Sequence, residues 1–206
     1  MLDQPDDVPR PEAVTPSERA LRESTLVVRA QDGDAGAFER LVHSYEKELL
    51  RLGYRMLSDL GEAQDAVQDS LVLSWRQLPT LEDPRAFQAW VYQLMTRRCL
   101  NLLRSRRRRR TSLTGEGDLD QEPAQRAEGD HLDPPSAAAQ SSALGAGLDV
   151  ALTTLSAELR ACWVLKELHH LSYPEIAYAI GVPVATVRGR IARARLHLAK
   201  EMSEWR

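Results

Sequence analysis

Apolar residues recur at steps of three, four and seven positions through most of the chain, which is the spacing of one face of an α-helix. The pattern is clearest over 35–57, where the apolar positions are Phe38, Leu41, Val42, Tyr45, Leu49, Leu52 and Met56. A second helix is expected over 62–78, ended by Pro79, and a third from Asp83-Pro84, an N-cap acid followed by proline. No stretch alternates like a β-strand, so we predict an all-α fold.

Two stretches lack this pattern. Residues 1–18 are rich in proline and charge, and residues 111–147 are filled with Gly, Asp, Glu, Pro, Ala and Ser. Neither holds enough apolar surface to offset the entropy lost on ordering it. We therefore expect a disordered leader, a helical module over 19–110, a flexible acidic linker, and a second small helical module over 148–206, without internal repeats.

The second module has the pattern of a helix-turn-helix. Ser172 and Glu175 have the spacing of a capping box, and Gly181 suits a left-handed helix cap. The next helix has an apolar side made of Val184, Val187, Ile191, Ala194 and Leu198. Its other side carries Ala185, Thr186, Gly189, Ala192 and Arg193, flanked by Arg188 and Arg190. A basic helix after a tight turn predicts binding in a DNA major groove, and a merely solvated basic face is the alternative.

The helix expected over 62–78 has an acidic side. Glu62, Asp65 and Asp69 fall in one narrow sector, and small or apolar residues fill the opposite side. Val72 and Leu73 flank the acids instead of joining the core. Apolar groups beside exposed acids favour a protein interface, but a hydrated face with two ordinary exposed apolar residues explains the pattern equally well.

The third helix brings aromatic rings close to arginines. The rings are Phe87, Trp90 and Tyr92, and the polar residues near them are Arg85, Arg97, Arg98, Asn101 and Arg104. This combination suits single-stranded DNA, because rings stack on bases while arginines bind phosphates. Phe87 and Trp90 are explained equally well as core residues.

Composition narrows the function classes. The chain has 206 residues and a formal net charge of -3, yet residues 104–110 are almost all arginine, and an acidic stretch follows them. Cys99 and Cys162 stand apart, without the spacing of a disulfide framework or a zinc site. We expect no cofactor, no metal and no catalytic set, and we interpret His169-His170 as a surface pair. No stretch is long and apolar enough for a membrane span, so a cytoplasmic protein is expected.

Four stretches carry a family resemblance: DGDAGAFERLVHSY, EAQDAVQDSLVLSW, AFQAWVYQLMTRRCLNLLRSRRRR and ELHHLSYPEIAYAIGVPVATVRGRIARAR. In this order and spacing they resemble the extracytoplasmic-function (ECF) group of bacterial sigma factors, the dissociable promoter-recognition subunits of RNA polymerase. The resemblance covers residues 22–206 apart from the linker. It implies a protein that is not an enzyme and that directs core polymerase to promoters, under the control of an anti-sigma factor.

The resemblance also implies residue roles. The segment that grips the β′ clamp helices of the polymerase matches Asp65, Gln68, Asp69, Val72 and Leu73. The loop over 79–90 matches one that captures a flipped base, and -10 element contacts match Arg85, Phe87, Trp90, Arg97, Arg98, Asn101 and Arg104. Contacts with the -35 element match Tyr173, Thr186, Arg188, Gly189, Arg190, Ala192 and Arg193. The β flap is a further expected partner, and the acidic linker resembles a segment that threads the polymerase cleft.

The sequence departs from the family pattern at four positions. Arg97 occupies a position where relatives often have Asn, and Asn101 occupies one where many have Asp. Gly189 occupies a position where serine is frequent, and Ala192 occupies one where a larger side chain is frequent. These changes affect strand melting and -35 specificity, since direct readout needs side chains that reach base edges. Because the sequence stops at Arg206, we expect no extra C-terminal domain of the kind that some relatives have. The rival functions are a stand-alone helix-turn-helix regulator of operator DNA and an adaptor that binds polymerase without reading promoters.

Overall fold

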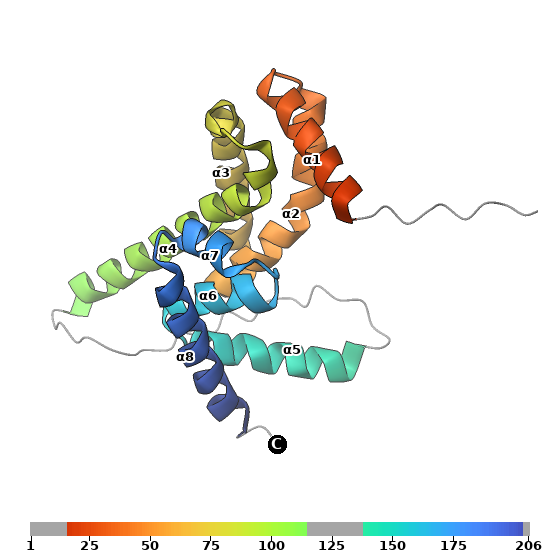
Figure 1. The fold of residues 1–206 in the computed structure, drawn as a ribbon. Coiled ribbons are helices and arrows are strands. Elements are labelled where there is room, and N and C mark those ends of the chain that lie inside the picture. The colour runs from red at the N-terminus through yellow and green to blue at the C-terminus, as the bar shows by residue number, and fades with distance from the viewer. Residues whose placement is uncertain (1–15, 115–137, 204–206) are drawn as a thin grey trace, which may run out of the picture.

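The computed structural model describes residues 16–114 and 138–203, and the regular elements within them are all helical (Figure 1). The predicted all-α class is confirmed. The first module contains α1 (Pro16–Gln31), α2 (Ala35–Leu57), α3 (Leu60–Gln77), the 3-10 turns η1 (Leu78–Thr80) and η2 (Pro84–Ala86), and α4 (Phe87–Thr114). The second module contains α5 (Ala138–Thr153), α6 (Ala157–Glu167), α7 (Tyr173–Ile180) and α8 (Val184–Ser203).

Three aspartates define where α2, α3 and η2 begin. The carboxylates of Asp34 and Asp59 each accept a hydrogen bond from the amide three residues ahead, at 2.9 and 2.8 Å. The Asp83 carboxylate accepts from the amide two residues ahead at 2.9 Å, where η2 leads into α4. These bonds satisfy amides that have no partner inside the helix. The helix start predicted at Asp83 is therefore present, with one 3-10 turn before the α-helix.

The α2 helix supplies the centre of the first module. It occupies the predicted range, and Leu41, Leu49, Leu52 and Met56 are almost fully buried. Tyr45 is buried with them and donates its hydroxyl to Glu23 of α1 at 2.6 Å. The α3 and α4 helices pack on the same face of α2, so the three- and four-residue spacing seen in the sequence corresponds to a real core side.

Helices enter both stretches that lack apolar periodicity. The α1 helix begins at Pro16, inside the expected leader, and residues 1–15 lie outside the described residues. The α4 helix continues to Thr114 and α5 begins at Ala138, so both ends of the expected linker are helical. The rest of the linker, 115–137, lies outside the described residues. Arginine and alanine, which dominate these helical ends, are among the best helix formers even without an apolar face to bury.

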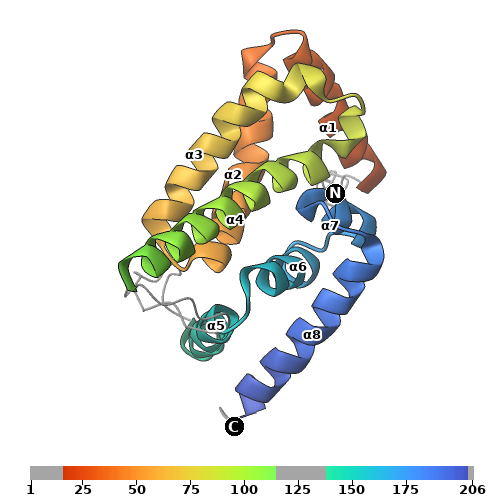
Figure 2. The same cartoon turned by 90° about the vertical axis from the view of Figure 1, so that its left-hand side faces the viewer.

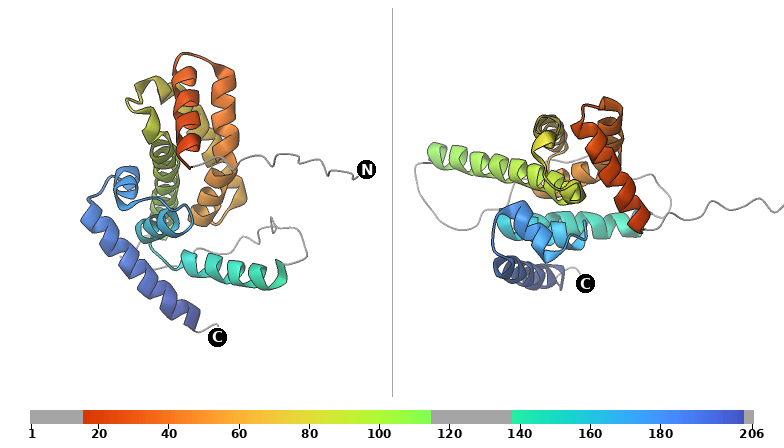
Figure 3. Two further views of the ribbon diagram at one scale, coloured as in Figure 1. Left: turned by 45° about the vertical axis from the view of Figure 1, so that its right-hand side comes forward. Right: turned by 45° about the horizontal axis from the view of Figure 1, so that its top comes forward.

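The second module is the predicted helix-turn-helix with two helices in front of it. Ser172 and Glu175 form both bonds of the capping box, and Gly181 ends α7 with φ of 75°. In α8 the predicted inner side is correct, because Val187, Ile191, Ala194 and Leu198 are buried. That side packs on α6, and α6 separates α8 from the first module, which leaves the far side of α8 outermost (Figure 3).

The two modules pack against each other. The α7 helix lies against α4, and α6 lies against α2 (Figure 2). Gln93 donates a side-chain hydrogen bond to the carbonyl of Tyr178 at 2.8 Å, and the Arg160 guanidinium donates to the carbonyl of Met56 at 2.7 Å. Arg160 is only 6% exposed, and this burial lowers its pKa to about 10. Sequence patterns gave no indication of this packing.

His169 lies in the interface between the modules, which corrects the interpretation of His169-His170 as a surface pair. Its side chain is 3% exposed, and its Nδ1 lies 3.0 Å from the Tyr92 hydroxyl. Its Nε2 is buried without a hydrogen-bond partner among the described residues. Burial lowers the pKa of His169 to about 4. Only His170 is exposed, with a positive φ of 56°.

Candidate polymerase and nucleic-acid interfaces

The α3 helix presents the residues expected to bind polymerase on its outer side. Asp65, Gln68, Asp69, Val72 and Leu73 are all exposed, whereas the small residues on the other side of the helix are buried. Val72 is 52% and Leu73 39% exposed, which is high for large apolar side chains. The structure therefore brings the five residues together on one surface, as the spacing predicted.

This surface borders a shallow pocket between α3 and α4. The pocket has a volume of about 290 Å³, and Val72, Leu73, Leu94 and Arg98 are among its lining residues. The carboxylate of Asp69 forms an ion pair with the Arg98 guanidinium at 2.5 Å. Asp69 was expected to bind polymerase and Arg98 to bind the -10 element, so the two expected surfaces share an edge.

The polar residues expected to bind the -10 element lie on the surface. Arg85, Arg97, Arg98, Asn101 and Arg104 are exposed, and the last two are joined by a hydrogen bond of 3.3 Å from Arg104 to the Asn101 side-chain oxygen. Arg85 lies on η2 and the other four residues lie on α4, so the cationic groups of Arg97, Arg98 and Arg104 lie along one helix. Phosphate groups of a DNA strand suit such an arrangement.

Phe87 and Trp90 do not belong to this surface. Their exposed fractions are 2% and 6%, their ring centroids lie 5.9 Å apart, and the Phe87 ring meets the Tyr45 ring edge-on. Neither ring is available to stack on a base in this structure, which corrects the expectation that they contact DNA. They are the core residues of the alternative interpretation.

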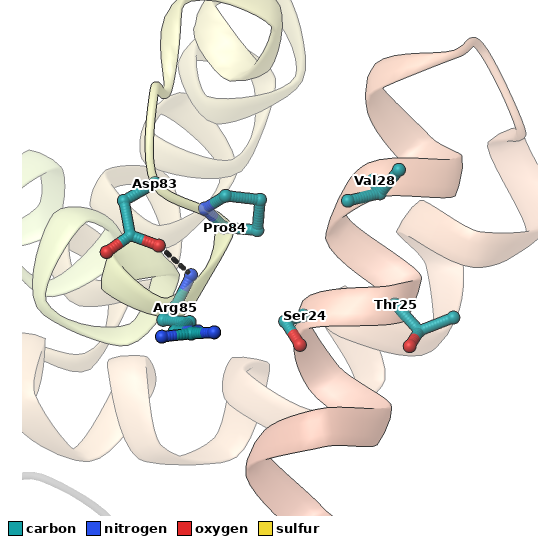
Figure 4. A pocket seen from close by; sticks show the side chains of 6 residues that line it. All are labelled: Ser24, Thr25, Val28, Asp83, Pro84 and Arg85. Atoms are coloured by element: carbon teal, nitrogen blue, oxygen red, sulfur yellow. Dashed lines mark hydrogen bonds between the residues drawn. The ribbon is translucent and has the colours of Figure 1, made fainter.

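A second pocket lies where α1 faces η2 (Figure 4). Its volume is about 340 Å³, and it is lined by Ser24, Thr25, Val28, Asp83, Pro84 and Arg85. Residues 83–85 belong to the loop that was expected to capture a base. The α1 wall was missed, because nothing in a sequence pattern indicates that α1 and this loop are neighbours. In the structure, Val28 of this wall is 45% exposed, which is high for an apolar side chain.

The residues expected to bind the -35 element come mostly from the outer side of α8. Arg188, Gly189, Ala192 and Arg193 are exposed, and Thr186 is half-buried. Tyr173 is also half-buried, at the start of α7. The structure thus brings the start of α7 and the outer side of α8 together.

Arg190 is the exception among the expected -35 contacts. It is half-buried, and its Nη1 is inaccessible to solvent and has no hydrogen-bond partner among the described residues. The guanidinium lies close enough to Cys162 to lower the pKa of that thiol, although burial, the larger effect, raises it. Arg190 therefore points into the module in this structure, which corrects the expectation that it faces DNA.

These surfaces present exposed charged and apolar side chains. No group of three His, Cys, Asp or Glu side chains within the described residues is placed to hold a metal ion. In the same part of the chain, no helix has the length and apolar character needed to cross a bilayer. An all-α chain with a basic helix-turn-helix at one end and an acidic-apolar face at the other belongs to the helix-turn-helix DNA-binding proteins.

Two family models match the chain. Residues 41–109 match sigma-70 region 2, and residues 146–198 match sigma-70 region 4. The RNA polymerase sigma-H factor of Pseudomonas aeruginosa is 34% identical over 88% of this chain and 94% of its own length. The ECF RNA polymerase sigma factor SigE of Mycolicibacterium smegmatis is 32% identical over 93% of this chain and 73% of its own length. The chain belongs to the ECF sigma factors of the sigma-70 family.

Solved structures share the fold. CnrH, in a complex with the cytosolic domain of CnrY, superposes with a TM-score of 0.66 at 23% identity, over 89% of this chain and 98% of CnrH. The sigma factor RpoE of Bartonella quintana, in a complex with the anti-sigma factor NepR, gives 0.61 at 23% identity, over 81% of this chain and 96% of RpoE. The family models and the sigma factors of Pseudomonas aeruginosa and Mycolicibacterium smegmatis support the sigma-factor prediction and not the stand-alone regulator: the protein is a transcription initiation factor that directs RNA polymerase to promoters.

Proposed function

We propose that the outer side of α3 binds the clamp helices of the polymerase β′ subunit through Asp65, Gln68, Asp69, Val72 and Leu73. The observation that carries this proposal is the exposure of Val72 and Leu73 beside two carboxylates and a shallow pocket. Exposed apolar groups with charges at their rim are typical of a surface that another protein covers. The residue matches to the family support the same surface.

The two DNA contacts follow from the remaining surfaces. Arg85, Arg97, Arg98, Asn101 and Arg104 bind the -10 element, and the pocket between α1 and η2 receives an unpaired base. Thr186, Arg188, Gly189, Ala192 and Arg193 face the -35 element. Neither contact alone needs to be strong, because two linked contacts reinforce each other through their effective concentration. Residues 19–110 and 148–206 are the two binding units, and the segment between them sets their spacing.

We also propose how the protein is controlled and where in the cell it acts. An anti-sigma factor binds this chain, a proposal that is supported by the complex of RpoE with the anti-sigma factor NepR. The protein acts in the cytoplasm, where polymerase and chromosome are found. It contributes no catalytic group, since the polymerase forms the phosphodiester bonds.

The test of the polymerase surface is a binding titration. Fluorescently labelled protein is titrated with core polymerase, and wild type is compared with the triple variant Asp65→Asn, Asp69→Asn, Leu73→Ser. All three residues are exposed, so the variant should fold normally. We expect its Kd to rise by at least tenfold, since truncating a central contact typically costs about 1 to 2 kcal/mol.

The matched control removes the same groups from another surface. Glu39→Gln, Glu46→Gln and Leu21→Ser take two carboxylates from α2 and one exposed leucine from α1. This variant is expected to bind polymerase as wild type does. Equal affinity of the triple variant and wild type would refute the proposed surface. Equal weakening by both variants would point to a general charge effect.

A further inference from the structure

Among the arginines of α8, Arg188 is held in a different way from the others. Arg195 forms an ion pair with Glu167 at 2.6 Å. Arg193 donates a hydrogen bond to the carbonyl of Gly189, one turn earlier, at 3.3 Å. Arg190 points inward. Arg188 is exposed, and its guanidinium carbon lies 5.5 Å from the centroid of the Tyr173 ring.

A ring contact leaves the guanidinium donors available. The attraction is between a cation and the negative face of the ring, and it operates at centroid distances up to about 6 Å. The Arg188 side chain makes no hydrogen bond to any residue within 16–114 or 138–203. Its N–H groups are therefore free for an outside acceptor while the ring limits where the guanidinium can lie. Arginine binds the O6 and N7 atoms of guanine with two parallel hydrogen bonds, which demands such a defined orientation.

The Tyr173 ring is itself held in place. Tyr173 is the first residue of α7, directly after the capping-box residue Ser172. The Lys166 ammonium lies 4.9 Å from the centroid of the same ring and donates a hydrogen bond to the carbonyl of Leu171 at 3.1 Å. The backbone at the start of α7 and a cation from α6 thus both restrain the ring. Restraint of this kind lowers the entropy that Arg188 loses when it binds.

The neighbours of Arg188 on α8 increase its importance. Gly189 has no side chain, and a Cβ added there would meet nothing within 4 Å. Ala192 is exposed and carries only a methyl group. Short side chains at both positions leave few groups long enough to reach base edges from this part of the helix. Base discrimination by α8 therefore depends strongly on the placement of Arg188.

We propose that Tyr173 is a positioning residue whose ring holds the Arg188 guanidinium for a bidentate contact with a guanine of the -35 element. Tyr173 acts through the face of its ring, which attracts the guanidinium, and not through a hydrogen bond from its hydroxyl to DNA. This proposal rests on the proposed -35 contact of α8 and adds the means by which that contact becomes specific for guanine.

The experiment uses full-length protein bound to core polymerase. A promoter obtained by run-off transcription of genomic fragments is rebuilt with a randomised -35 element, and bound sequences are enriched and counted. Wild type is expected to prefer guanine at one position by about five- to 150-fold, which corresponds to the roughly 1 to 3 kcal/mol of a bidentate contact. Arg188→Ala and Tyr173→Leu should both lose that preference, at the same position. The double variant should lose no more than either single variant.

Two conservative variants separate positioning from other roles. Tyr173→Phe and Tyr173→Trp keep a ring and are expected to keep the guanine preference. Tyr178→Leu is the matched control, because Tyr178 is an exposed tyrosine of the same helix, and it should leave the preference unchanged. If Tyr173→Leu melts below the assay temperature, the Phe and Trp variants still test the proposal.

Several results overturn the proposal. Loss of the preference in Tyr173→Phe would assign the role to the hydroxyl, and an unchanged preference in Tyr173→Leu would remove any role for the ring. Equal weakening at every sequence in Arg188→Ala, with a smaller dependence on salt, would make Arg188 a phosphate contact. If wild-type protein yields no transcript with polymerase, the proposed promoter recognition fails, and this role fails with it.

Discussion

Acid should weaken the packing of the two modules through His169. In the folded protein its side chain is 3% exposed and burial holds its pKa at about 4, whereas an unfolded histidine has a pKa of about 6.5. Between these values the unfolded chain binds a proton that the folded chain excludes. The free energy of unfolding therefore falls as the pH falls below about 6.5, and this loss is complete near pH 4.

The size of the effect follows from the two pKa values. Above pH 7.5 both states are neutral at His169, so the residue contributes no pH dependence there. At pH 5 the unfolded state is almost fully protonated and the folded state is mostly not, which amounts to about 2 kcal/mol. The groups around the imidazole include Tyr92, Glu48 and Arg51. Glu48 partly opposes the lowering of the His169 pKa by attracting the proton, and the neighbouring His170 and then Arg51 add to the lowering.

The assay is urea denaturation of full-length protein at pH 8 and pH 5, with His169→Asn and His170→Asn compared with wild type. Wild type should lose about 2 kcal/mol more between the two pH values than His169→Asn does. His170→Asn should lose almost as much as wild type, because it keeps the burial of His169 and removes only the smaller effect of the His170 charge. The His170 variant is the matched control, because His170 is exposed and asparagine tolerates its positive φ. Identical pH dependence in all three proteins would contradict the argument that a buried neutral imidazole joins the modules.

Three further changes test the packing. Arg160→Met removes the side-chain bonds to three backbone carbonyls, so the modules should separate more readily and the radius of gyration measured by X-ray scattering should rise. Ser172→Ala deletes the N-cap of α7 and should lower the stability of that helix by about 1 kcal/mol, measured as faster amide hydrogen exchange in α7. Gly53→Ala places a Cβ 2.6 Å from the end of Met95 and 3.1 Å from the Ala63 methyl, and should destabilise the first module by about 1 to 3 kcal/mol in thermal melts.

Local signals in the sequence predicted the elements that depend on neighbouring residues. The capping box at Ser172 and the left-handed Gly181 each act within one helical turn, so a short stretch of sequence contains the whole interaction. The buried side of α2 and the exposure of Asp65 and Asp69 on α3 follow from helical periodicity alone, whereas Glu62 is half-buried and pairs with Arg106 of α4. For these elements the structure confirms what the pattern indicated.

Contacts between distant segments could not be predicted in this way. Helical periodicity predicts that a side chain is buried but not which residues cover it. His169 lies just after the end of α6, so helical periodicity does not apply to it and could not predict its burial. The same limit applies to the α1 wall of the second pocket and to the inward turn of Arg190. The first part of helix α5, residues 138–147, was missed for another reason. Its Ala, Ser and Gly composition carries no apolar stripe, although alanine itself favours a helix.

The most direct test of promoter recognition is run-off transcription with core polymerase and genomic fragments, with and without this protein. New discrete transcripts should appear only when the protein is present, and they should vanish when Asp65, Asp69 and Leu73 are changed together. Tight binding of DNA by the protein alone, with no change in the transcripts that polymerase makes, would contradict the assignment as a sigma factor.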